Sequence, residues 1–374
     1  MEKVAALENY QSENIEWRQL ISLAALYSFV IIGWIAYHNY QPKLLVKFDF
    51  VQFTSALLIA QGIILVLTPP IAGRLGDRFR FQRGHRIPII SSGISFAAMI
   101  FMAVAFTLFS SPGDTFKWIL PILIILWLVA MSIFTSPALS TLELFTPIEK
   151  LPRAMALLTI VSNLIYSLEP VIVDIIDYVG APLTFVAGGA GVFLSGYALR
   201  KNSLSLFGTK GGQRPQASFT FDTKRSQYGL ILLFGLGLGV ITTLLFDFIP
   251  DRLEVALSGW FALSGKQMLV AILVLSAVFS LPASNWISKQ GLAKAYRASL
   301  VTALAMGLVL MMVSIAPMAL VAALVYTVAF TVLSVSGLPL AIEKANYFEK
   351  VYCVGFFFSG VAIPEAILKI AESL

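Results

Sequence analysis

Residues 69–88 read Pro-Pro-Ile-Ala-Gly-Arg-Leu-Gly-Asp-Arg-Phe-Arg-Phe-Gln-Arg-Gly-His-Arg-Ile-Pro, and this segment decides the fold. It carries five arginines and one acid, Asp77, between two long apolar runs at 51–70 and 88–109. Charged side chains are costly inside the hydrocarbon of a bilayer, so the segment must lie at a membrane face. We therefore predict a basic loop that connects two membrane-spanning helices and sets the orientation of the chain.

The composition is that of a polytopic membrane protein. Of the 374 residues, 58% are hydrophobic and 12% are charged, which is about half of the charged fraction of a soluble domain. The net charge of +6 then reflects membrane topology and not nucleic-acid binding. The single cysteine, Cys353, excludes an intrachain disulfide framework. The two histidines, His38 and His85, are expected on different loops, so we predict neither a metal site nor a cofactor.

Hydropathy predicts an all-α protein with about eleven transmembrane helices, six before a polar interval and five after it. We expect an N-terminal six-helix bundle at 1–199, a cytoplasmic linker at 200–227, and a C-terminal bundle at 228–374 without a twelfth helix. The predicted spans are 20–38, 51–70, 88–109, 118–144, 153–178, 181–199, 228–248, 267–287, 297–315, 318–340 and 351–370.

Lysine and arginine positions predict the topology. With the N-terminus inside, 20 of the 26 basic residues fall on the inner side, as the positive-inside rule requires. The odd number of spans then places the C-terminus on the opposite side. We expect an integral protein of the bacterial inner membrane or an equivalent membrane.

The two halves resemble each other, which suggests an internal duplication. The fifth span contains Glu169-Pro170 and the eleventh contains Pro364-Glu365, each about 15 residues past a basic residue at the start of the span. Both acids would therefore lie at a similar depth in the membrane. The alternative is a coincidence between two apolar runs.

The segment Gly73-x-Leu-Gly-Asp77-Arg78, followed by Arg83-Gly-His-Arg86, resembles the loop between the second and third helices of the major facilitator superfamily. Residues 147–154 resemble the loop after the fourth helix of that superfamily. A degraded copy at 284–291 lacks the acid. The resemblance implies a two-bundle fold that normally has twelve spans, which leaves room for a protein partner at the position of the twelfth.

The ending of the loop, Gly-His-Arg-Ile-Pro at 84–88, resembles that of the glycoside–cation and sucrose symporter branch. Bacteriochlorophyll-delivery relatives end this loop similarly. In the superfamily this loop latches the cytoplasmic ends of the two halves, and the resemblance assigns that role to Gly73, Asp77, Arg78, Arg83 and Arg86. The alternative is a membrane anchor of solvated charges, which would need neither the acid nor the glycines.

Polar residues inside the spans are candidates for function. Glu169 and Glu365 are candidates for proton coupling because an acid within a membrane helix is costly; the alternative is a structural acid bonded to a neighbouring hydroxyl. No lysine or arginine lies in the middle of a span, which favours a neutral solute. Aromatic and amide side chains that suit a sugar are expected to line the substrate cavity, namely Tyr27, Trp34, Gln61, Trp127, Asn163, Tyr166 and Tyr326.

These features predict a secondary active transporter, and no motif of an enzyme is present. We expect symport of a small neutral solute, such as a sugar or glycoside, with a proton or another cation by alternating access. The expected partners are membrane lipid, the solute and the coupling ion, with no nucleic acid. Two alternatives remain: a non-transporting assembly or pigment-delivery factor on the same fold, and an efflux pump for amphipathic compounds.

Overall fold

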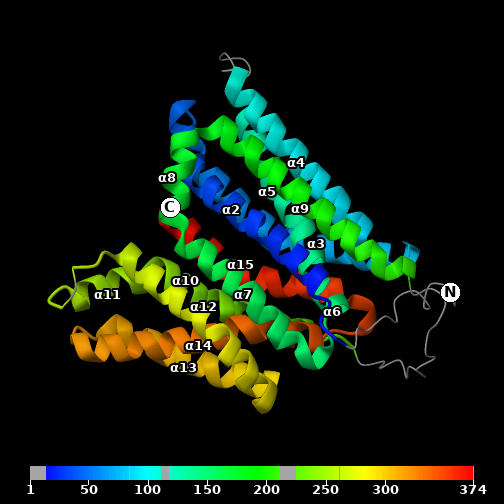
Figure 1. Cartoon of the computed structure of the whole chain (residues 1–374). Coiled ribbons are helices and arrows are strands. Elements are labelled where there is room, and N and C mark those ends of the chain that lie inside the picture. The colour runs from blue at the N-terminus through cyan, green and yellow to red at the C-terminus, as the bar shows by residue number, and fades with distance from the viewer. Residues whose placement is uncertain (1–13, 84, 111–117, 210–224, 261, 374) are drawn as a thin grey trace.

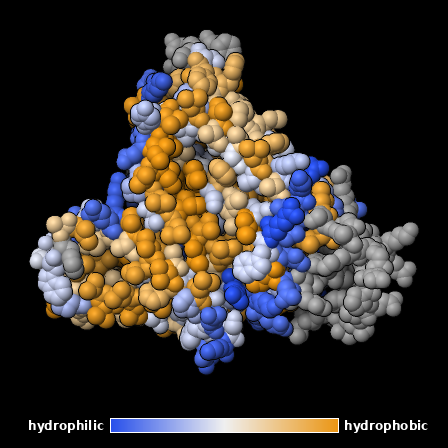
Figure 2. Space-filling model, in the orientation of Figure 1, coloured by the Kyte–Doolittle hydropathy of each residue, from blue (hydrophilic) through white to orange (hydrophobic). Residues whose placement is uncertain are grey.

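The computed structural model describes residues 14–83, 85–110, 118–209, 225–260 and 262–373, and in these ranges the chain contains helices and no strands (Figure 1). Ten helices in the described ranges are long and apolar enough to cross a membrane, and one bent pair could form an eleventh span. The predicted all-α membrane fold is confirmed. Apolar side chains dominate the surface in Figure 2, between hydrophilic patches near the ends of the helices.

The helices follow the predicted order. The first half comprises α2 (Trp17–Lys47), η1 (Val51–Phe53), α3 (Thr54–Arg83), α4 (Ile87–Ser110), α5 (Ile119–Ser140), α6 (Leu142–Phe145), η2 (Ile148–Lys150), α7 (Leu151–Ser167), α8 (Glu169–Val179) and α9 (Ala181–Thr209). The second half comprises α10 (Tyr228–Thr243), η3 (Leu244–Phe248), α11 (Ile249–Leu257), α12 (Gly265–Gln290), α13 (Leu292–Met312), α14 (Ala316–Glu343), η4 (Tyr347–Glu349) and α15 (Lys350–Ser373). Most of the predicted linker, 210–224, lies outside the described residues.

Several predicted boundaries are wrong because helices continue beyond the apolar runs. Helix α9 extends to Thr209, through the first ten residues of the predicted linker. Helix α2 extends to Lys47, so His38 lies within a helix and not in a loop. Helix α3 extends to Arg83 and includes most of the predicted basic loop. None of these helices needs to end where the hydrocarbon ends, since water also accommodates a helix with charged side chains.

Prolines interrupt α3 without ending it. Pro70 has no N–H, so the carbonyl of Val66, one turn earlier, loses its helical hydrogen bond. The hydroxyl of Ser359 in α15 donates to that carbonyl oxygen at 2.5 Å. A neighbouring helix thus satisfies the freed backbone group, as buried backbone in a membrane requires.

Two predicted spans have irregular backbones. The fifth is broken at Leu168 into α7 and α8, which meet at a bend of 58°. Pro170 lies in the first turn of α8, where its missing N–H costs nothing. The seventh contains η3, a π-helical turn, and continues through α11 to Leu257.

Two pairs of helices make the most extensive contacts between the halves. Helix α3 packs along α15, and α7 packs against α12; α5 also contacts α15, and α7 also contacts α14. The approach of α3 to α15 is so close that a Cβ at Gly73 would lie 2.5 Å from the carbonyl oxygen of Val351. In Figure 1 the two groups of helices spread apart toward α8 and α11. The α7–α12 contact includes a polar chain in which Asn163 Nδ2 donates to Ser276 Oγ at 2.8 Å, and Ser276 Oγ lies 2.8 Å from Thr331 Oγ1 of α14.

Candidate functional site

The basic end of α3 is attached to the first turn of α15 through Asp77. Its Oδ1 accepts from the backbone N–H of Val351 at 3.2 Å, and its Oδ2 accepts from that of Tyr352 at 2.9 Å. The first N–H groups of a helix have no partner within the helix and carry the positive end of its dipole. The carboxylate of one half therefore caps a helix of the other half, in a site where Asp77 is 6% exposed.

A second contact at this end involves Arg80, which sequence analysis did not single out. Its guanidinium donates to the carbonyl oxygen of Tyr347 at 2.8 Å and lies 4.5 Å from the centre of the Tyr347 ring. Gly73, Gly76, Asp77 and Arg80 follow the spacing i, i+3, i+4, i+7 of one helix face. This spacing was visible in the sequence and would have identified Arg80 if the segment had been predicted as a helix.

The third contact is an ion-pair bridge centred on Glu143, another residue that sequence analysis missed. Arg86 donates to Glu143 Oε1 at 2.6 Å and to Ser140 Oγ at 2.7 Å. Lys350, at the start of α15, lies 2.5 Å from Glu143 Oε2. Glu143 therefore connects cations from both halves. The sequence feature that could have identified Glu143 is its place as an acid at the end of an apolar run.

The five predicted latch residues thus divide into three groups. Gly73, Asp77 and Arg86 belong to the contact between the halves, which we call the latch together with Arg80, Glu143, Tyr347 and Lys350. Arg78 is exposed on the other side of α3. The side chain of Arg83 lies outside the described part of the structure.

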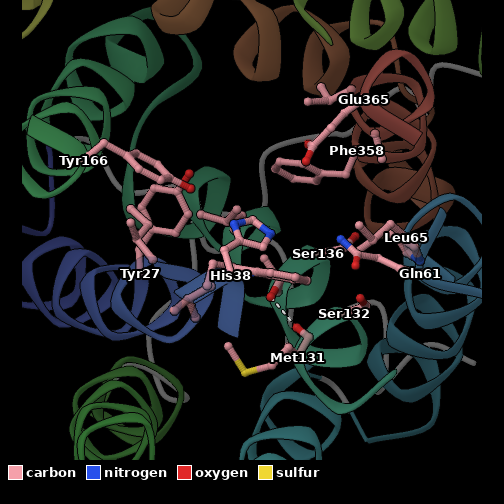
Figure 3. A pocket seen from close by; sticks show the side chains of 18 residues that line it. Tyr27, His38, Gln61, Leu65, Met131, Ser132, Ser136, Tyr166, Phe358 and Glu365 are labelled. Atoms are coloured by element: carbon pink, nitrogen blue, oxygen red, sulfur yellow. Dashed lines mark hydrogen bonds between the residues drawn. The ribbon is translucent and has the colours of Figure 1, made fainter. Parts of the chain in front are cut away.

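A cavity of about 270 Å³ lies between the halves (Figure 3). Its walls come from α2, α3, α5 and α7 of the first half and from α15 of the second. Ser136 and Leu139 form its buried end, where they are 1% and 3% exposed. His38 and Glu365 form its exposed end, and the side chain of Glu365 is 42% exposed. The cavity is therefore buried toward the latch and accessible from the opposite end.

Several polar groups of the cavity wall are already bonded within the protein. Ser132 and Thr135 donate to carbonyl oxygens of their own helix. Gln61 Oε1 accepts from the Tyr37 hydroxyl at 3.0 Å. The buried Ser136 hydroxyl has no hydrogen-bond partner among the described residues. An unsatisfied buried hydroxyl is unfavourable, so Ser136 is the clearest hydrogen-bonding position for a bound solute.

Four of the seven predicted cavity residues line the cavity, namely Tyr27, Trp34, Gln61 and Tyr166. Trp127 is not part of its wall; its ring is stacked on Tyr37 with centroids 4.7 Å apart. Asn163 is bonded to Ser276 in the α7–α12 contact. The hydroxyl of Tyr326 donates to the carbonyl oxygen of Ile241 at 2.6 Å, within the second half. The side chains of Trp127, Asn163 and Tyr326 therefore hold helices together and do not line the cavity.

The two predicted coupling acids lie in different environments. Glu365 lines the exposed end of the cavity and forms an ion pair with Lys369, one turn along α15. Glu169 does not line the cavity; it is half-buried at the start of α8, where it interacts electrostatically with Lys266.

Two further titratable residues interact with the Glu365–Lys369 ion pair. His38 lines the cavity from α2 and interacts electrostatically with Glu365 and Lys369. Asp247, in the π-helical turn, also interacts with this ion pair. His38 was missed because its apolar run was taken to end there.

Comparisons with known proteins agree with this architecture. The model of the Major Facilitator Superfamily matches residues 19–364. The crystal structure of the human organic anion transporter MFSD10 (TETRAN) is similar, with a TM-score of 0.63, 15% identity, and coverage of 97% of this chain and 94% of that chain. A bacterial homologue of the iron transporter ferroportin, in the outward-facing state with soaked iron, has a TM-score of 0.64, 15% identity, and coverage of 96% and 91%. At these identities the likeness shows the fold alone. Comparison with curated proteins finds no match.

Proposed function

The chain belongs to the major facilitator superfamily, and from this premise we propose that it is a secondary active transporter that moves a small neutral solute by alternating access. One observation carries the proposal: the cavity lies between the two halves and is buried toward the latch, where contacts between the halves close it. Breaking the latch would open that end. We infer that the basic end lies on the inner side of a bacterial inner membrane or an equivalent membrane, so that the cavity opens to the outside.

Glu365 is the proposed coupling residue. Its carboxylate faces the cavity, pairs with Lys369 and belongs to the half opposite His38. Protonation would remove its charge and weaken this pair, which would change the interactions at the outer end of the cavity. The proposed coupling ion is therefore a proton. Glu169 has less support, because it does not line the cavity.

The cavity wall supports a solute with an apolar face and a few hydrogen-bonding groups. Aromatic rings of Tyr27, Trp34 and Tyr166 offer flat apolar surfaces, and Gln61 and Ser136 offer directional contacts. A glycoside or sugar, as the symporter branch would imply, has both features. Among the described residues no three His, Cys, Asp or Glu side chains are grouped as a metal site, so we favour an organic solute over a metal ion.

The experiment is solute-driven proton entry into proteoliposomes that contain a pH-sensitive dye. The probes are sucrose, 4-nitrophenyl glucoside and, for the amphipathic efflux alternative, Hoechst 33342. We expect a neutral glycoside to cause proton entry with the wild type and not with Glu365→Gln. A response to Hoechst 33342 alone would replace this proposal with efflux. If no probe moves protons or is exchanged, the non-transporting alternative is favoured.

A further inference from the structure

A second, larger cavity lies on the outside of the second half, away from the proposed transport path. It is a groove of about 640 Å³ between α12, α13 and α14. Its rims are exposed, with Trp286 at 43% and Leu324 at 44% exposure, and its floor is buried at Ala329 and Ser299. Apart from Ser299 and Thr302 its lining is apolar. Such a groove in a membrane helix bundle is shaped for an acyl chain and not for a polar solute.

The groove leads to two lysines at the basic side of the membrane. On α12 it is lined at positions 279, 282, 283 and 286, and the next residue on that face is Lys289. On α13 it is lined at positions 298, 299 and 302, and one turn before them is Lys294. Gly291 alone connects α12 to α13, so the two lysines lie near each other at the end of the groove.

Lys289 and Lys294 are both exposed, and neither has an acidic partner among the residues that the structure describes. They belong to the second-half copy of the basic segment, in which Ser288 occupies the position of Asp77. The copy has therefore kept its cation and lost the acid that attaches the first-half segment to α15. Trp286, one turn from Lys289, is a residue type typical of the membrane–water interface.

We propose that this groove binds an anionic phospholipid of the leaflet on the basic side, with one acyl chain in the groove and the phosphate at Lys289 and Lys294. Basic residues next to a groove between membrane helices attract anionic headgroups. The charge at the end of the groove selects the headgroup, and the apolar lining holds the chain. This site is separate from the central cavity and does not depend on the proposed transport activity.

The test is native mass spectrometry of the detergent-purified protein with equal amounts of phosphatidylglycerol and phosphatidylcholine. We expect preferential retention of phosphatidylglycerol by the wild type. Near a membrane surface each lysine contributes about a fivefold preference, so K289Q/K294Q should lower the preference roughly 25-fold. The control K47Q/R252Q removes two exposed cations at the opposite membrane face and should keep it. A298F fills the groove without removing charge and should lower retention of both lipids.

Three results would overturn the proposal. Equal retention of the two lipids by the wild type would remove the headgroup selection. An unchanged preference in K289Q/K294Q would show that other cations select the lipid. Normal retention by A298F would show that no chain enters the groove. Each variant is compared after monodisperse elution, and K294Q alone replaces the double variant if the latter does not fold.

Discussion

Replacing Asp77 by Asn should release the basic end of α3 from α15. In the wild type, one carboxylate accepts two backbone N–H groups at the first turn of α15. Asparagine keeps one acceptor oxygen but replaces the other by an NH₂ group, which cannot accept. The substitution therefore removes one hydrogen bond and the attraction between a negative charge and the helix dipole, while the size of the side chain is unchanged.

The magnitude follows from these two losses. A hydrogen bond to a charged group contributes about 1.5–3 kcal/mol, and a charge at a partly buried helix end contributes about 0.3–2 kcal/mol. We expect the latched state to lose about 2–5 kcal/mol relative to the unlatched state. At 1.4 kcal/mol per factor of ten, the ratio of latched to unlatched protein should fall roughly 30- to 4,000-fold.

The assay is a distance measurement between two spin labels, at Gln82 in α3 and Glu343 at the end of α14. Both residues are exposed, and Cys353 is replaced by Ala so that only the introduced cysteines are labelled. The wild type should give one short distance, and Asp77→Asn should add a second, longer one. Transport should slow while the protein still inserts. The matched control is Arg78→Gln, which removes a charge from the exposed side of α3.

Two outcomes would contradict this reasoning. An unchanged distance distribution in folded Asp77→Asn would show that the capping contact does not hold the halves together. An equal change in Arg78→Gln would show that total charge, and not the contact with α15, controls this end.

Three further predictions use the same preparation. Gly73→Val should lengthen the same label distance more than Asp77→Asn does, because even a Cβ would collide with the Val351 carbonyl oxygen; an unchanged distance would contradict it. Ser359→Ala should lower the unfolding free energy by about 0.5–2 kcal/mol, seen as a lower thermal midpoint than that of the exposed control Ser258→Ala, because the Val66 carbonyl loses its donor. Glu365→Gln should abolish solute-driven proton entry but allow solute exchange, whereas Glu169→Gln should retain both; the reverse pattern would move the coupling site to Glu169.

Hydropathy was sufficient to predict the spans because lipid requires long apolar segments. It could not predict where α2 and α3 end, since a helix continues into water without an apolar signal. That error concealed both His38 and Arg80. His38 was expected in a loop and not on a helix that lines the cavity. Arg80 was expected in a loop and not on the helix face that carries Gly73 and Asp77.

The sequence also could not predict which face of each helix points into the cavity. Trp34 and Trp127 are the same residue type in two apolar helices, yet Trp34 lines the cavity and Trp127 packs on Tyr37. Asp77 was selected on a resemblance, but the groups that it binds are backbone N–H groups of Val351 and Tyr352. Any residue supplies such groups, except proline, so no side-chain pattern marks them.

The chain of uncharged side chains between α7, α12 and α14 has a consequence for how ions affect the protein. Asn163, Ser276 and Thr331 carry no charge, so dissolved salt and acid leave their mutual attraction nearly unchanged. The Glu143 bridge consists of full charges, but its Arg86 and Glu143 side chains are 0% and 5% exposed, so dissolved salt screens this bridge only weakly. Rising ionic strength should therefore leave both seams largely closed, and salt alone should not drive the halves apart.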